Sequence, residues 1–128
     1  MSEKISLGIY NLNWSFERLR LEEGTETSIT GMLKYQISEK GIEEIKNQYG
    51  DINFRALEEL LSYRIMNALF LTLRETSGRN LLEQRDIFQN RTRILIRTFI
   101  KEMGLNYVDL TLVDIWIWGE EKIDTNNF

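Results

Sequence analysis

The stretch TSITGMLKYQIS, residues 27–38, constrains the fold more than any other part of the chain. Its apolar side chains fall on odd positions and its polar ones on even positions: Ile29, Leu33, Tyr35 and Ile37 against Ser28, Thr30, Lys34 and Gln36. Because successive side chains of a strand point to opposite faces, this alternation predicts a strand with one buried and one wet face. Gly31 falls on the buried side, where a missing side chain permits a bulge or close packing by a helix.

The segments on either side predict further strands and helices. Residues 4–21 are apolar near period two, with a phase slip at YNLN that predicts a turn or bulge between two strands. GIEEIKNQYG predicts a short helix that stops at Gly50, with Ile42 and Ile45 inward. Residues 54–75 predict the main helix, ended by Gly78 and enclosed where it is apolar nearly all round, from Ile65 to Leu73.

A short helix or turn in RNLLEQRD leads to a last helix, predicted at residues 86–103. Its predicted inward stripe is Phe88, Thr92, Leu95, Phe99 and Met103. Gly104 is expected just past that helix, in the left-handed conformation that glycine adopts easily. Residues 106–117 then predict a strand with Val108, Leu110 and Leu112 on one side.

The order of strands, helices and a strand predicts an α+β fold, a small antiparallel or mixed sheet packed against helices. All 128 residues form one predicted domain, with a core at about 14–117 and a tail at 119–128 that frays. The predicted core consists of Leu33, Tyr35, Ile37, Leu57, Leu61, Ile65, Leu69, Leu95, Phe99, Val108 and Leu110.

Composition limits the chemistry. The chain has no Cys and no His, which excludes thiolate chemistry and removes the commonest general base and metal ligand. Its net charge of −4 argues against a nucleic-acid binder. The first residues do not resemble a signal peptide, and no apolar run reaches the length of a membrane span. We therefore expect no enzyme, no cofactor and no metal, and a location in the cytoplasm or at the periphery of a membrane.

The ordered set of segments resembles the stomatin–prohibitin–flotillin (SPFH) domain, in its prohibitin-like form. LEEGTETSITGMLKYQIS is similar to the family's turn and long strand, and IKNQYGD to its short helix and break. ALEELLSYRIMNALFLTLRETSGRNLLEQRD is similar to its central helix and the connection that follows, and IKEMGLNYVDLTLVDI to its closing helix–Gly–strand. The resemblance covers roughly residues 14–115 and implies a wedge-shaped scaffold domain whose copies associate side by side, normally on a membrane surface.

Where this family has a membrane anchor and a coiled coil, the chain has a polar N-terminus and the ending WIWGEEKIDTNNF. The sequence leaves open whether the chain is a fragment or a stand-alone relative. A membrane surface would then be reached through a parent protein.

The two tryptophans of the last strand are the leading site candidates. Trp116 and Trp118 share parity, with Ile115 and Ile117 opposite, so both point to one side. They form either an interaction surface or a cap on the sheet's own core. Asp114 is the candidate charge that would block pairing along this strand.

Charged clusters offer weaker candidates. Arg93 and Arg97 share a helix face, predicted opposite the apolar stripe, and form either a patch for phosphate or lipid head groups or a solvated face. Asp109 and Asp114 differ in parity, which argues against a shared acid–base or metal site. Glu22, Glu23 and Glu26 are interpreted as a solvated turn.

Two functions from different classes remain after this survey. The first is a non-enzymatic scaffold that self-associates weakly, through a sheet edge or the tryptophan end. The second is a small ligand- or lipid-binding module that uses a groove between helices and sheet.

Overall fold

The computed structural model describes residues 4–118, so the tail predicted to fray lies outside the described residues. The elements in chain order are β1 (Gly8–Arg20), β2 (Glu26–Ile37), α1 (Glu39–Tyr49), α2 (Phe54–Leu73), α3 (Gly78–Glu83), α4 (Arg85–Glu102) and β3 (Asn106–Ile117). The strands form one antiparallel sheet in the order β1-β2-β3. The predicted α+β class is confirmed.

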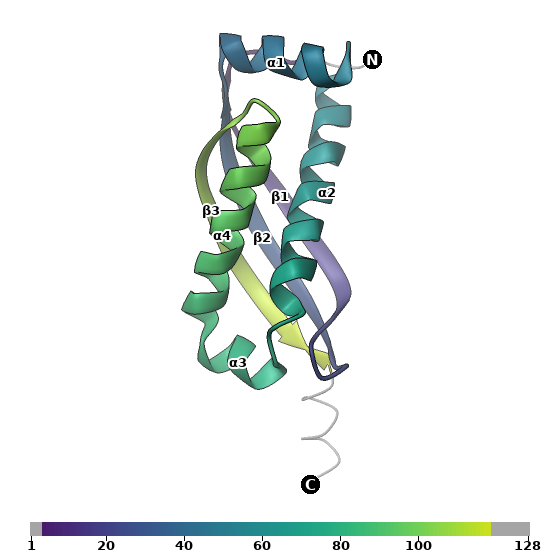
Figure 1. Ribbon diagram of the computed structural model, residues 1–128, viewed down its shortest axis with the longest axis vertical. Coiled ribbons are helices and arrows are strands. Elements are labelled where there is room, and N and C mark those ends of the chain that lie inside the picture. The colour runs from purple at the N-terminus through teal and green to yellow at the C-terminus, as the bar shows by residue number, and fades with distance from the viewer. Residues whose placement is uncertain (1–3, 119–128) are drawn as a thin grey trace, which may run out of the picture.

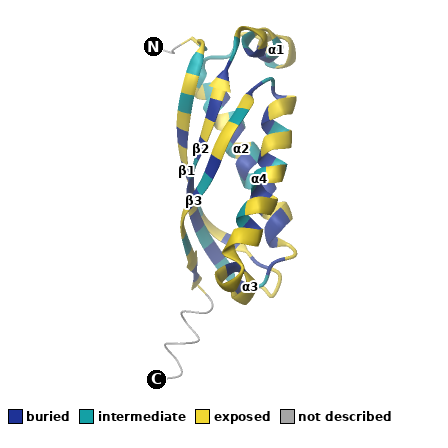
Figure 2. Cartoon of the chain, turned by 90° about the vertical axis from the view of Figure 1, so that its left-hand side faces the viewer, coloured by how far each residue is buried: buried dark blue, intermediate teal, exposed yellow. Residues whose placement is uncertain are grey.

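The helices cover one face of this sheet. α2 lies over β1 and α4 over β3, while α1 crosses one end of the long axis (Figure 1). Seen from the side, none of the helices within residues 4–118 lies on the opposite face of the sheet (Figure 2). The molecule is therefore a two-layer structure whose sheet has one packed and one bare face.

β1 is one continuous strand that pairs in register through residues 10–13, so the turn or bulge predicted at YNLN is wrong. Leu12 and Trp14 are buried under the helices, whereas Leu7 and Ile9 are exposed. The phase slip thus reflects apolar residues on the bare face rather than a change of strand. The true irregularity comes later, between Phe16 and Leu19.

β2 behaves as predicted. Its odd-numbered residues are buried, and Gly31 lies on the buried face, as expected. Gly31 pairs in register with Trp14 of β1, and the indole ring of Trp14 lies directly over Gly31. A Cβ atom there would collide with this ring and would stand 2.7 Å from the carbonyl oxygen of Thr111. Glycine is needed at this position because a large neighbour occupies its space.

α1 ends at Gly50, as predicted, and begins two residues earlier than the predicted segment, behind a Ser38 cap. α2 is less enclosed than predicted. Phe70 and Leu71 are exposed because α2 meets the sheet on one side and α4 on another, which leaves part of its surface free. The predicted stop is also wrong: α2 ends at Leu73, and Gly78 opens α3 behind a Ser77 cap.

The buried stripe of α4 follows a strict four-residue spacing. Its buried residues are Phe88, Thr92, Ile96 and Ile100, with Met103 just beyond the helix. Leu95 and Phe99, predicted inward, are only half-buried. Spacings of three and four both mark a helix face, and the structure selects the face one residue further round.

Gly104 follows α4 with φ of 90°, as predicted, and the chain turns back into β3. β3 contains two register shifts against β2, one at each side of its middle. The first skips Val108, which is 44% exposed, so its predicted burial is wrong. The second skips Val113 and brings Ile117 onto the buried face. Each bulge adds one residue and reverses the alternation.

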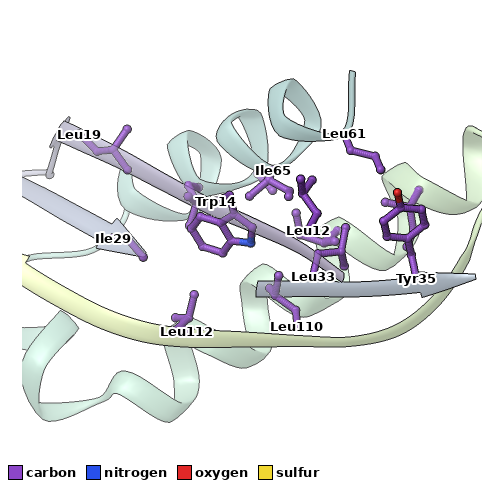
Figure 3. Packing of buried hydrophobic residues seen from close by; sticks show 14 of the residues in the cluster. Leu12, Trp14, Leu19, Ile29, Leu33, Tyr35, Leu61, Ile65, Leu110 and Leu112 are labelled. Atoms are coloured by element: carbon purple, nitrogen blue, oxygen red, sulfur yellow. The ribbon is translucent and has the colours of Figure 1, made fainter. Parts of the chain in front are cut away.

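The core fills the space between sheet and helices (Figure 3). Of the predicted core, all but Leu95, Phe99 and Val108 are buried. Two buried polar atoms have no hydrogen-bond partner among the described residues: the Tyr35 hydroxyl and Trp14 Nε1. Both belong to residues of the sheet face that packs against α2 (Figure 3).

Candidate interaction surface

Trp116 and Trp118 lie on the bare side of the sheet. They are 46% and 39% exposed, whereas Ile117 between them is buried. The bulge at Val113 produces this arrangement, because it turns the odd-numbered isoleucines inward and the tryptophans outward. Neither tryptophan caps the helix-covered core, so that interpretation is wrong.

Contacts with β1 and β2 hold the pair in a defined geometry. The two indole rings meet edge to face with centroids 6.3 Å apart. Trp118 Nε1 donates a hydrogen bond of 2.8 Å to Ser28 Oγ, and the Arg18 guanidinium lies 5.0 Å from the Trp118 ring centroid. Arg18 also pairs with Glu26 at 3.2 Å. The result is an exposed aromatic surface that is already ordered; we call Trp116, Trp118 and Arg18 the tryptophan end.

Asp114 lies beside this surface. It is exposed and pairs in register with Thr30 of β2. Asp109 pairs in register with Lys34, another exposed position, so the parity argument that placed the two acids on opposite faces is wrong. The bulge between them reverses the alternation. Among residues 4–118, however, no three His, Cys, Asp or Glu residues gather as a metal site would require.

Arg93 and Arg97 were predicted to lie opposite the buried stripe of α4, and this prediction is wrong. Both lie beside the stripe and face β3. Arg93 Nε donates to the carbonyl oxygen of Leu110 at 2.9 Å, and its guanidinium pairs with Asp109 at 3.6 Å. The Arg97 guanidinium stacks 5.0 Å from the centroid of the Tyr107 ring. Both arginines bind the strand, which leaves fewer donors for a phosphate group.

Arg93 belongs to a set of polar side chains that covers the edge of β3. Arg85 donates to the carbonyl oxygen of Leu112 at 2.6 Å, and Gln89 Oε1 accepts from its N–H at 3.1 Å. We call Arg85, Gln89 and Arg93 the β3 edge cover. Their i, i+4 spacing on α4 aligns them on one helix face along the strand. This set was not predicted, although the spacing of Arg85, Gln89 and Arg93 is visible in the sequence.

The Tyr107 hydroxyl completes this arrangement by accepting from the N–H of Leu110 at 2.9 Å. Burial raises the pKa of this hydroxyl, while the bond from Leu110 works in the opposite direction. Both backbone groups of Leu110 and both of Leu112 are therefore bonded to side chains. The middle of β3 is closed to a further strand.

Of the three glutamates interpreted as a solvated turn, Glu22 is exposed, whereas Glu23 and Glu26 make structural contacts. Glu23 accepts from the Gly78 N–H at 2.5 Å and from the Thr25 hydroxyl at 2.9 Å. Desolvation pushes the pKa of this carboxyl upward, but the hydrogen bonds outweigh it and hold the pKa below its usual value. Glu23 thus ties the turn to the start of α3, and Glu26 is held by Arg18.

Surface grooves lie between α2 and the strands. One is lined by Phe16 of β1 and by Arg55, Glu58, Glu59, Ser62, Tyr63 and Met66 of α2. A second is lined by residues of the β1–β2 turn, by α2 around Phe70 and by Phe99 of α4. The first meets β1, an edge strand of the sheet, at Phe16.

No protein-family model matches the chain, and no curated protein matches it either. The resemblance to the SPFH domain therefore stays a prediction. Within residues 4–118, none of the helices combines the length and apolarity needed to cross a bilayer.

Proposed function

We propose that this protein is a non-enzymatic scaffold domain, whose copies associate through the tryptophan end. The observation that carries the proposal is an ordered, exposed Trp116–Trp118 pair on the bare face of the sheet. Tryptophan and arginine are the residues most enriched at the energetic centres of protein interfaces. Their fixed geometry lowers the entropy lost on binding.

The surroundings of the pair support a protein contact. Val113 is 60% exposed near the tryptophans on the same strand, and Asp114 and Arg18 supply charges of both signs. An apolar centre with a charged rim is the usual composition of an interface. Resemblance to the SPFH domain, whose members assemble side by side, motivates the choice of a second copy as partner. Attachment to a membrane would be a property of a longer parent protein.

Sedimentation velocity over a concentration series tests the proposal. We expect the average mass to rise with a dissociation constant in the micromolar range or weaker, about 8 kcal/mol or less. The variant Trp116→Ala/Trp118→Ala should associate at least tenfold more weakly. A matched control is Leu82→Ala/Ile94→Ala, which removes two apolar side chains exposed on α3 and α4. Equal association of the tryptophan variant and the wild type would contradict the proposal, as would a wild type that is monomeric at several hundred micromolar.

A further inference from the structure

The two edges of the sheet differ sharply. β3 carries two bulges, two aspartates and the β3 edge cover. Between Gly8 and Phe16, β1 has no bulge, no charged residue and no side chain of residues 4–118 bonded along its outer edge. This stretch, GIYNLNWSF, has no charged residue and no proline, and it pairs with β2 without a register shift. Charges, bulges and prolines are the usual means by which proteins protect edge strands.

The outer backbone groups of this stretch are free within the described part of the chain. Among the strands of residues 4–118, β1 has β2 as its single neighbour in the sheet. In an antiparallel pair every second residue directs its N–H and C=O away from the partner strand. Among residues 4–118, no side chain and no backbone group outside β2 bonds to the backbone of Gly8–Phe16. The edge therefore offers a row of donors and acceptors.

An apolar groove meets this edge at Phe16, the last residue of the stretch. Tyr63, 62% exposed, and the half-buried Met66 stand on the wall formed by α2, and Phe16 lies at its base. An added strand would direct alternate side chains toward this wall and the others toward the bare face. Backbone bonding and side-chain packing thus coincide at one place.

We propose that the β1 edge pairs with β1 of a second copy, antiparallel about a two-fold axis. The partner must supply an extended strand, and Gly8–Phe16 is itself such a strand and carries no charge that would repel its copy. Two copies set no like charges opposite one another along this stretch, so nothing in it opposes self-pairing.

The covered β3 edge decides the geometry. Pairing of β1 with β3 of a neighbour would continue without end, but the β3 edge cover occupies the groups that it would need. Pairing of β1 with β1 uses the open edge of each copy and closes at a dimer. This contact shares with the proposed function the requirement that copies associate, and it adds a second interface to the tryptophan end.

The test introduces charges along the proposed β1–β1 interface. Asn11 and Asn13 are exposed on the bare face of β1, so the variant Asn11→Lys/Asn13→Lys puts lysines of both copies side by side. The matched control is Thr30→Lys/Gln36→Lys, which adds the same charge to the same face on the central strand β2. Both pairs are made in the wild type and in the Trp116→Ala/Trp118→Ala background, which isolates the β1 contact.

We expect the tryptophan background to form dimers and its β1 lysine variant to dimerise at least tenfold more weakly, with the control unchanged. Mixing the lysine variant with Asn11→Glu/Asn13→Glu should restore a dimer, because opposite charges then meet. Restoration by mixing also shows that the variants fold. An unweakened lysine variant overturns the β1 contact and leaves the proposed function standing. An unweakened tryptophan variant overturns the proposed function and leaves the β1 contact standing.

Hydrogen exchange of the unmodified protein gives a second readout. Amides in residues 8–16 should become more protected as the protein concentration rises, whatever the folding of the variants. Protection that does not change while the mass increases overturns the β1 contact. Protection of a monomer by an added extended peptide from another protein overturns the assignment of a second copy as the occupant.

Discussion

At the scale of single residues, the Tyr35 hydroxyl is the clearest source of lost stability. It is fully buried and has no hydrogen-bond partner among the described residues. An unsatisfied buried hydroxyl costs about 1–3 kcal/mol. We expect Tyr35→Phe to raise the free energy of unfolding by about 1 kcal/mol, measured by urea denaturation. Tyr10→Phe is the control: its hydroxyl donates to the carbonyl oxygen of Ser6 at 2.9 Å, so its removal should bring no gain.

The same hydroxyl makes stability depend on pH. Burial, and after it the negative charge of Glu58, raises the pKa of Tyr35 above its usual value of 10.0. Above that pH the unfolded chain releases a proton that the folded chain retains. The free energy of unfolding therefore falls as pH rises, by up to about 1.4 kcal/mol per pH unit for this group. We expect denaturation between pH 9 and pH 11, about one unit either side of that value, to show a smaller decline for Tyr35→Phe. An equal decline in both proteins would contradict this assignment.

Alternation within a run was readable from sequence at this scale, but the effect of a bulge was not. Trp116 and Trp118 share a side, as predicted: Trp116 pairs in register with Ser28, and Trp118 bonds to the Ser28 hydroxyl. Val108 was misplaced because a bulge shifts the register between it and Leu110. Bulges arise from pairing with a distant strand, which the local pattern does not record.

At the scale of elements, the phase of α4 leads to a stability prediction. Ile96 is fully buried, whereas Phe99 is half-buried and has the Arg64 guanidinium 5.8 Å from its ring centroid. Ile96→Ala should lower the free energy of unfolding by about 2–5 kcal/mol through the cavity that it leaves. Phe99→Ala should cost less, although phenylalanine is the larger side chain. Chemical denaturation of both variants measures the difference. A greater loss of unfolding free energy for Phe99→Ala than for Ile96→Ala would contradict this prediction.

The β3 edge cover makes a second prediction about elements. Arg93→Met keeps much of the side-chain volume but removes the donor to the Leu110 carbonyl oxygen and the partner of Asp109. We expect the free energy of unfolding to fall by about 1–3 kcal/mol. The variant should also aggregate more readily, because the edge of β3 is uncovered. Arg91→Met is the control, since Arg91 is exposed on the same helix and makes none of these contacts. Thermal unfolding with light scattering measures both effects, and matching results for the two variants would remove the role given to Arg93.

Elements with strong local signals were predicted well. β2 followed from its alternation, and the end of α1 followed from Gly50, whereas the Ser38 cap that starts the helix was not predicted. The end of α2 was predicted too late because Gly78 was taken as a stop, whereas Ser77 caps a new helix there. A glycine between two helices is compatible with the end of one or the start of the next, and tertiary contacts such as Glu23 with Gly78 select between them.

At the scale of the whole molecule, the predicted class was correct but the division of the surface was not foreseen. Which face of the sheet carries helices was clear from β2, since its two sides differ in polarity. Which edge is open was not clear, because this depends on the strand order and on the side-chain contacts of α4 with β3, which the local pattern does not record. The tryptophan end remains the candidate interaction surface. Arg93 and Arg97, predicted as an anion or lipid patch, instead contact β3.

The direction of the strands has a mechanical consequence. β1 starts at one end of the long axis and β3 finishes at the other, with β2 antiparallel between them (Figure 1). A pull on the two ends of the described chain acts along the strands and across the inter-strand hydrogen bonds, which run perpendicular to the strands. The hydrogen bonds of β1 with β2, and of β2 with β3, are then loaded simultaneously in shear. They are not broken one after another, as they would be if the strands were peeled apart. A scaffold built from this domain would resist tension along its length best in the direction in which its own chain ends pull.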